Sequence, residues 1–226
     1  MKIRCFITGT DTDVGKTLIA QALLYKAAEQ GLQTAGFKPI AAGVDAHGKN
    51  VDALLLQQAS TVPLSYAQVN PLCFTKPMAP HIAAAQEKRR LRGSQISGFI
   101  RGMLSHTADF IVIEGAGGWA LPLNHSERFD HVVAQLKLPV VIVVGMRLGC
   151  LNHALLTAQA VQAKGLPMAW VATQIDPHMK AVQANLDTLS TMMPGQYLGF
   201  IPHDNNINPQ TAANHLHGLP QSESVP

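Results

Sequence analysis

The sequence is poor in charge and in cysteine, and each shortage excludes a class of protein. Charged residues make up only 14% of the 226 residues, and 17 Lys and Arg against 14 Asp and Glu leave a formal charge of +3. Such a small excess does not indicate a nucleic-acid-binding protein. The cysteines (Cys5, Cys73 and Cys150) are an odd number in apolar or small-residue surroundings, which is typical of buried free thiols in a reducing compartment.

Long hydrophobic runs are also missing. The longest apolar stretch, 138–146, has the length of a strand and is far shorter than a membrane-spanning helix. The N-terminal residues lack both the apolar region and the cleavage site of a signal peptide. Hydrophobic residues nevertheless make up 47% of the chain, which excludes intrinsic disorder. We therefore expect a cytoplasmic globular protein with neither a membrane nor a nucleic acid as partner.

Short apolar runs alternate with longer amphipathic stretches along the chain. Near-continuous Val and Ile runs are typical of strands buried on both faces of a parallel sheet. The alternation predicts a doubly wound α/β fold, a mostly parallel sheet flanked by helices in a single domain over 1–220, with a frayed tail at 221–226. The expected strands are 4–8, 35–39, 110–114, 139–145, 168–173 and 198–201, and the expected helices are 16–30, 51–60, 94–105 (with Ser94 as N-cap), 151–164 and 180–192. We expect 61–80, which contains four prolines, to be irregular.

A Gly/Thr-rich segment between the first strand and the first helix has the context of a phosphate-binding loop. Residues 8–17 read Thr-Gly-Thr-Asp-Thr-Asp-Val-Gly-Lys-Thr. Backbone N–H groups and the dipole of a helix N-terminus favour an anion there. Gly15 lets the main chain approach a phosphate, Lys16 can reach the β- and γ-phosphates, and Thr17 can ligate Mg²⁺. Five residues separate Gly9 from Gly15 where the usual motif has four, and the alternative is an incidental strand–turn–helix corner.

Two further charged residues end predicted strands and should lie at the same sheet edge as the loop. Glu114 follows Phe-Ile-Val-Ile and precedes a run of small residues, and Lys38 ends the second strand before Pro39. Ligands of open parallel sheets bind beyond the carboxyl ends of the strands. Glu114 is therefore a candidate Mg²⁺ ligand, and Lys38 can neutralise charge on a transferring phosphoryl group. A solvated turn and a surface lysine are the alternatives.

Other polar groups carry less chemistry. The ten histidines form no metal-ligating pair at helical i, i+4 spacing. His81 follows Pro80 near a possible substrate loop, although a local hydrogen bond explains it equally well. The basic run 88–92 is typical of a solvated helix end or loop. Cys150 is expected to have a packing role.

These segments together resemble the dethiobiotin synthetases, a family of phosphate-loop enzymes that use ATP. The resemblance rests on six motifs that span the chain to about Pro202. They are residues 8–17, Gly-Phe-Lys-Pro at 36–39, Val-Asn-Pro at 69–71, Pro-His at 80–81, Glu-Gly-Ala-Gly-Gly-Trp at 114–119, and Val-Gly-Met-Arg-Leu-Gly-Cys-Leu-Asn-His at 144–153. The lengthened phosphate loop is the form this family has.

The resemblance implies an activity and a set of roles. It implies that 7,8-diaminononanoate and CO₂ (or bicarbonate) are converted with MgATP into dethiobiotin, through a carbamate and a carbamic–phosphoric anhydride, by a homodimer. It implies Thr12, Lys16 and Lys38 as catalytic residues and Thr17, Asp52 and Glu114 as Mg²⁺ ligands. The implied nucleotide-binding residues are Asp13, Val14, Gly15, Lys16, Thr17, Asp52, Glu114, Gly117, Thr173 and Pro202. The implied substrate-binding residues are Thr12, Lys38, Ala42, Gly118, Cys150, Leu151 and Asn152, the last three across the dimer interface. Without the resemblance, Asp52 would be simply an acid favoured by a helix dipole.

The sequence departs from the family pattern at three positions. Ala42 stands where the family often has a serine that contacts the substrate. Thr173, followed by Gln174, replaces an asparagine that reads the base, and Asn185 replaces a tyrosine near the substrate tail. The departures affect recognition of the base and of the substrate tail, while the phosphate and metal residues are intact.

Other functions share the phosphate loop. A partitioning-type switch ATPase carries a lysine five residues before the loop lysine, where this chain has Asp11, and tends to have a targeting tail. An amide-forming ligase of the cobyrinate type would need an additional glutaminase domain. A regulatory homologue that binds nucleotide without turnover is the remaining alternative.

Overall fold

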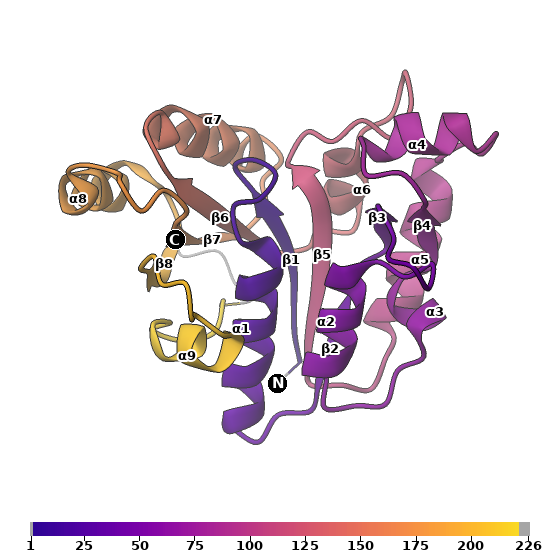
Figure 1. Ribbon diagram of the computed structural model, residues 1–226, viewed down its shortest axis with the longest axis horizontal. Coiled ribbons are helices and arrows are strands. Elements are labelled where there is room, and N and C mark those ends of the chain that lie inside the picture. The colour runs from indigo at the N-terminus through magenta and orange to yellow at the C-terminus, as the bar shows by residue number, and fades with distance from the viewer. Residues whose placement is uncertain (1, 222–226) are drawn as a thin grey trace.

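The computed structural model describes residues 2–221 and confirms the predicted α/β fold (Figure 1). Its main sheet has six strands in the order β2-β5-β1-β6-β7-β8, and all neighbouring pairs are parallel. The strands are β1 (Ile3–Gly9), β2 (Thr34–Phe37), β5 (Phe110–Gly118), β6 (Val140–Met146), β7 (Met168–Gln174) and β8 (Gln196–Ile201). The strand order reverses at β1, so the carboxyl ends of β1 and its neighbours β5 and β6 form a crevice where a ligand can bind.

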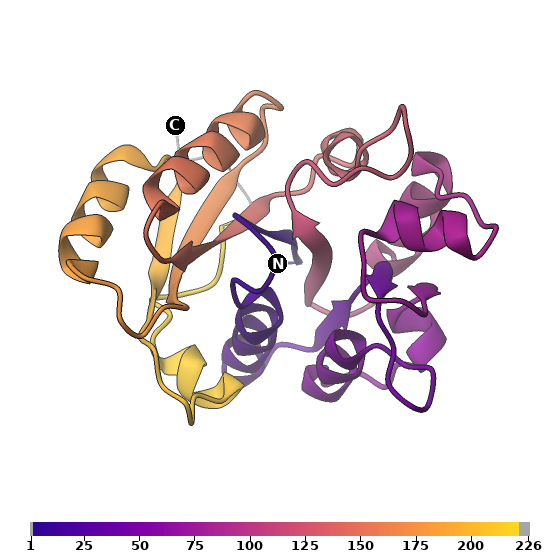
Figure 2. The ribbon, with the colours of Figure 1, turned by 45° about the horizontal axis from the view of Figure 1, so that its top comes forward.

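Helices cover both faces of this sheet. They are α1 (Lys16–Glu29), α2 (Val51–Ala59), α3 (Tyr66–Val69), α4 (Pro80–Gln86), α5 (Gly93–Leu104), α6 (Phe129–Gln135), α7 (Cys150–Gln162), α8 (Val182–Met192) and α9 (Pro209–Asn214). α1 packs between α2 and α9 on one face, and Figure 2 shows α7 on the other side of the strands from α1. This two-sided cover follows from right-handed crossovers that run in opposite directions along the sheet, from β1 through α1 to β2 on one side and from β6 through α7 to β7 on the other.

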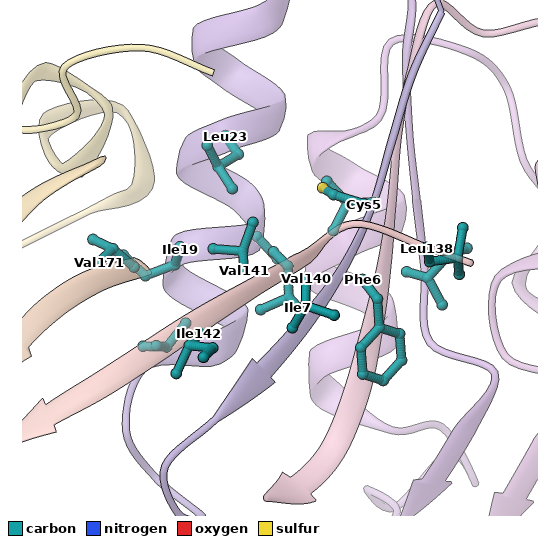
Figure 3. Packing of buried hydrophobic residues seen from close by; sticks show 14 of the residues in the cluster. Cys5, Phe6, Ile7, Ile19, Leu23, Leu138, Val140, Val141, Ile142 and Val171 are labelled. Carbon is teal, nitrogen blue, oxygen red and sulfur yellow. The ribbon is translucent and has the colours of Figure 1, made fainter. Parts of the chain in front are cut away.

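The core lies between the sheet and its helices. Ile7 on β1 and Val141 on β6 are fully buried, and Ile19 and Leu23 of α1 cover them (Figure 3). On the opposite face the ring of Phe6 packs edge-on against Phe129 of α6, with 5.2 Å between ring centroids. Because every central strand is buried on both faces, the β1–α1 corner that carries the phosphate loop is rigidly supported.

Several local expectations were wrong. The segment 61–80 is not irregular throughout, because it contains α3 and β4 (Leu72–Phe74), and β4 pairs in parallel with β3 (Ile40–Ala42) in a small second sheet. Ser94 is not the N-cap of α5. That helix begins at Gly93, whose N–H donates to Glu127 Oε1 at 3.2 Å, so a distant carboxylate replaces a local cap. Cys73 is half-buried and not buried, whereas Cys5 and Cys150 are buried.

Two expectations concern the ends of the chain and membranes. Gln221 donates a backbone hydrogen bond to Gln196 Oε1 at 3.0 Å, and residues 222–226 of the predicted tail lie outside the described residues. Within residues 2–221, no helix is both long enough and apolar enough to cross a membrane.

Candidate functional site

The phosphate loop joins β1 to α1 at the crevice. Gly15 precedes α1 with a φ of 90°, a conformation that favours glycine, and Asp13 is also left-handed at 57°. A Cβ on Gly9 would lie 2.6 Å from Val14 Cγ2, so the loop can fold back only over a glycine. The hydroxyl of Thr10, in the lengthened part of the loop, accepts the N–H of Gly145 on β6 at 3.2 Å and fixes the loop to the sheet.

Both candidate lysines point into this region. Lys16, in the first turn of α1, donates to the carbonyl oxygen of Asp11 across the loop at 2.8 Å. Lys38 follows β2, and its Nζ lies 2.5 Å from Glu114 Oε1 and 2.8 Å from Asp52 Oδ2. Glu114 sits on β5 between β1 and β2, so its carboxylate can meet both Lys38, which follows β2, and Thr17, in the helix that follows β1.

Glu114, Asp52 and Thr17 converge on one point. Thr17 Oγ1 donates to Glu114 Oε1 at 3.0 Å, and the ammonium of Lys38 lies between Glu114 and Asp52. Asp52 lies in the first turn of α2, where the helix dipole favours a negative charge. The structure therefore brings together the three side chains that were predicted to hold Mg²⁺.

Burial and neighbouring charges shift the pKa values of this cluster. Burial lowers the pKa of Lys16, and the positive charge of Lys38 adds to this effect. Burial also works against the charge on Lys38, but Glu114 and Asp52 more than offset it and raise the Lys38 pKa. Burial raises the pKa of Glu114 against the opposing effect of Lys38, whereas Asp52, although partly desolvated, has its pKa lowered by Lys38. Lys38 is thus held as a cation inside the protein.

The donor set fits Mg²⁺. Among the described residues Glu114 Oε2 is buried without a hydrogen-bond partner, which leaves a carboxylate oxygen free for a cation. Within the same residues no group of three or more His, Cys, Asp or Glu side chains could hold a metal ion alone. A hydroxyl with two carboxylates suits Mg²⁺, because this ion binds hard oxygen ligands and keeps several waters or phosphate oxygens.

A cavity of about 1020 Å³ opens above the cluster. Its polar floor includes Thr12, Asp13, Gly15, Lys16, Thr17, Lys38, Asp52 and Glu114. Its remaining wall is mainly apolar and includes Ala42, Pro77, Met78, Gly117, Gly118, Leu121 and Pro122. The cavity can therefore accept a molecule with an anionic end and an aliphatic chain.

Other predicted site residues lie outside the cavity lining. Val14 is buried, and its carbonyl accepts the hydroxyl of Thr173 at 2.5 Å, so Thr173 supports the loop from β7. Pro202 follows β8 and is half-buried. Cys150, Leu151 and Asn152 form the first turn of α7, beyond the cavity wall.

Sequence reasoning missed several residues that shape the site. Asn50 lines the cavity and caps α2, and Asn70 lies behind Lys38. Arg147, in the β6–α7 loop, pairs with Asp11 of the phosphate loop at 2.5 Å. An Asn two residues before a helical Asp52 is a recognisable N-cap signal, but nothing in the spacing links Asn70 or Arg147 to the loop.

The fold and the loop define a P-loop nucleotide-binding protein of the parallel α/β class. A family model described as an AAA domain matches residues 4–211. A solved plasmid partition protein from Borrelia burgdorferi shares the fold, with a TM-score of 0.58 and 13% identity over 95% of this chain and 96% of that chain. At that identity the likeness concerns the fold alone.

Sequence comparison narrows the class. The chain is 49% identical to the ATP-dependent dethiobiotin synthetase of Cellvibrio japonicus, over 93% of this chain and 94% of the relative. It is 46% identical to the corresponding enzyme of Aeromonas hydrophila, over 89% of this chain and 91% of that relative. The chain belongs to the family of ATP-dependent dethiobiotin synthetases.

Proposed function

We propose that this protein forms dethiobiotin from 7,8-diaminononanoate and CO₂ with ATP, as a cyclo-ligase of biotin biosynthesis. The observation that carries the proposal is the gathering of Lys16, Lys38 and Glu114 on the floor of one cavity with an apolar wall. The substrate is a diamine on a long aliphatic chain that ends in a carboxylate, so its reacting end suits the polar floor and its aliphatic chain suits the apolar wall. Family membership at 49% identity supports the same reaction.

The reaction needs charge neutralisation more than covalent catalysis. One substrate amine adds to CO₂ and loses a proton, which gives a carbamate. A carbamate oxygen then attacks the γ-phosphorus of ATP and the bond to ADP breaks, which gives a carbamic–phosphoric anhydride. The second amine attacks the carbonyl carbon, the ureido ring closes and phosphate leaves. Each intermediate is anionic, so fixed cations positioned beforehand lower the barriers.

The chain's own residues have distinct parts in this proposal. Lys16 and the loop N–H groups hold the phosphates, and Lys38 stabilises the carbamate and the phosphoryl group, with Thr12 beside the carbamate. Asp13, Val14, Gly15, Gly117, Thr173 and Pro202 are proposed to contact or support the nucleotide. Thr17, Asp52 and Glu114 would hold Mg²⁺, which neutralises phosphate charge when bound.

We further propose a cytoplasmic homodimer. Cys150, Leu151 and Asn152 begin a helix whose N–H groups suit a carboxylate, yet they lie outside the cavity of their own chain. A second copy would bring its own first turn of α7 to the substrate tail, which would then lie between that turn and the cavity wall formed by Ala42 and Gly118. Leu148, which is 96% exposed, and Leu156 of α7 would become buried in such a dimer. Free cysteines agree with a reducing compartment.

The test is a product assay on the purified protein. The protein is incubated with the diamine, bicarbonate and MgATP, and dethiobiotin and phosphate are both measured. We expect phosphate release that depends on the diamine and on bicarbonate, with one dethiobiotin for each phosphate. Phosphate release that needs neither compound and is stimulated by DNA or lipid would instead indicate a switch ATPase. Nucleotide binding without any turnover would indicate a regulatory homologue.

A further inference from the structure

A chain of hydrogen bonds behind the cavity joins the backbone of Lys38 to the start of α2. The strand β2 ends at Phe37, and Pro39 has no N–H to continue a ladder. The Lys38 peptide is held instead by the last residue of α3, Val69, and by Asn70 directly after it. Its N–H donates to the carbonyl of Val69 at 2.9 Å, and its carbonyl accepts Asn70 Nδ2 at 2.6 Å.

Tyr66 extends this chain from Asn70 to Asn50. The Tyr66 hydroxyl donates to Asn70 Oδ1 at 3.0 Å and accepts the backbone N–H of Asn50 at 2.8 Å. Burial raises the pKa of Tyr66 to about 12, so the hydroxyl keeps its proton at neutral and mildly alkaline pH. α2, α3 and β2 pack against one another beside the cavity, on the right of Figure 1.

Asn50 completes the chain at the helix that carries Asp52. Its side-chain oxygen accepts the N–H of Ala53 at 3.2 Å, and its amide donates to the carbonyl of Gly43 at 2.9 Å. The carboxylate of Asp52, two residues later, is 2.8 Å from Lys38 Nζ. The connections therefore close a ring that runs from the Lys38 backbone through Asn70, Tyr66, Asn50 and Asp52 to the Lys38 ammonium.

We propose that Tyr66 and Asn70 are positioning residues that fix the Lys38 ammonium relative to the Asp52 carboxylate. Lys38, Asn50 and Asn70 are all buried. Removing any one hydrogen bond of the chain therefore leaves a buried polar group with neither a protein partner nor water to bond to. Neither Tyr66 nor Asn70 lines the cavity. Their effect reaches the reaction only through the two side chains that they orient, and small displacements of positioned groups cost rate. This inference rests on the proposed function.

The test is a double-mutant cycle between Tyr66→Phe and Asp52→Asn. Tyr66→Phe keeps the ring and removes the hydroxyl link, and we expect kcat to fall about tenfold with the KM for the diamine little changed. In the Asp52→Asn background the same change should have almost no further effect, because the pair it orients is already broken. Asn70→Ala should behave as Tyr66→Phe does. Tyr197→Phe is the matched control, because Tyr197 is a half-buried tyrosine of β8 that packs on Trp170 of β7, and it should leave kcat unchanged.

Two results would overturn the proposal. One is a kcat of Tyr66→Phe equal to that of the unaltered protein. The other is a Tyr66→Phe substitution that lowers kcat by the same factor with Asp52 present and in the Asp52→Asn background. Equal factors would mean that the two substitutions act independently, whereas residues that act on the same pair give a smaller second effect.

A binding measurement separates this inference from the proposed function and from a loss of folding. Mn²⁺ is the probe, its affinity is measured by electron paramagnetic resonance with a non-hydrolysable ATP analogue, and the fold is checked by thermal unfolding. We expect Tyr66→Phe to weaken Mn²⁺ binding several-fold when Asp52 is present and to have no such effect in the Asp52→Asn background. A protein that makes no dethiobiotin but shows this pattern would refute the function alone. Equal Mn²⁺ affinity in folded Tyr66→Phe and unaltered protein would refute the positioning role alone.

Discussion

The ammonium of Lys38 lies 2.5 Å from Glu114 Oε1, and both side chains are almost completely buried. Removing one partner of an ion pair at this depth strongly destabilises the folded protein, because the remaining charge is buried without a partner and without water. Glu114 is also a proposed Mg²⁺ ligand, so Lys38 and the metal are attracted to the same carboxylate. Lys38 therefore connects metal binding with the stabilisation of the anionic intermediates.

The first prediction concerns Lys38→Met, which keeps the side-chain volume and removes the charge. We expect turnover to fall by about two orders of magnitude or more, because the developing phosphoryl and carbamate charges lose a fixed cation. We expect Mn²⁺ affinity without nucleotide to rise several-fold, because no ammonium competes for the Glu114 and Asp52 oxygens. Steady-state kinetics and Mn²⁺ titration check the two effects. Lys180→Met, at an exposed lysine, is the control, and weaker Mn²⁺ binding in Lys38→Met would contradict the shared carboxylates.

The second prediction is a pH dependence of nucleotide affinity. Burial and the neighbouring Lys38 lower the pKa of Lys16, so Lys16 loses its proton at a lower pH than an exposed lysine does. The charged form binds phosphate, so affinity falls as the pH rises through the Lys16 pKa. The slope approaches about tenfold per pH unit, because binding then requires uptake of one proton. Calorimetric titration with an ATP analogue from neutral to alkaline pH measures this profile. An affinity that stays constant across the ordinary lysine range would refute it.

The order of strands and helices could be predicted because burial on both faces leaves a clear pattern. The Val/Ile run of β6 and the apolar end of β1 are readable as strands, and the turn between β1 and α1 identifies the phosphate loop. Lys38 and Glu114 were found because the carboxyl-end side of adjacent strands in a parallel sheet was predicted to hold them, although β5 continues past Glu114 to Gly118 and β2 ends one residue before Lys38. By contrast, β3 and β4 have three residues each and pair only with one another, so no periodicity could develop.

The support behind the site could not be predicted because its members are joined by the tertiary fold. Tyr66 and Asn70 stand in a proline-rich segment that has the composition of a loop, and their partners Lys38 and Asn50 come from other elements. The same holds for Thr173. The family resemblance implies that Thr173 stands in place of a base-reading asparagine, and the structure places its hydroxyl on the carbonyl of Val14. The identity of a residue indicates which interactions its side chain can make, but only the tertiary packing shows which partner atom it contacts.

The third prediction restores a hydroxyl at Ala42. Ala42 ends β3 and lines the cavity, half-buried, at the position where the family resemblance implies a serine. Ala42→Ser should lower the KM for the diamine about two- to tenfold with a smaller change in kcat, because one net hydrogen bond contributes about 1 kcal/mol. Initial rates against diamine concentration measure it. Ala120→Ser, at an exposed position on the cavity rim, is the control, and a higher KM in Ala42→Ser would show that the added oxygen obstructs the substrate.

The fourth prediction tests the support of the phosphate loop by Thr173. Its hydroxyl donates to the buried carbonyl of Val14 at 2.5 Å, and its methyl group lies where a Cβ on Gly15 would be in contact at 3.5 Å. Thr173→Val keeps the shape and removes the donor, so the Val14 carbonyl loses a partner at a cost of about 1–3 kcal/mol. We expect a lower unfolding temperature and, because the loop must be ordered again when phosphate binds, a several-fold weaker affinity for ATP. Thr188→Val on α8, where the hydroxyl bonds only to the carbonyl of Ala184 in its own helix, should change neither quantity. If Thr173→Val lowers the unfolding temperature but leaves ATP affinity intact, Thr173 stabilises the sheet and not the conformation of the loop.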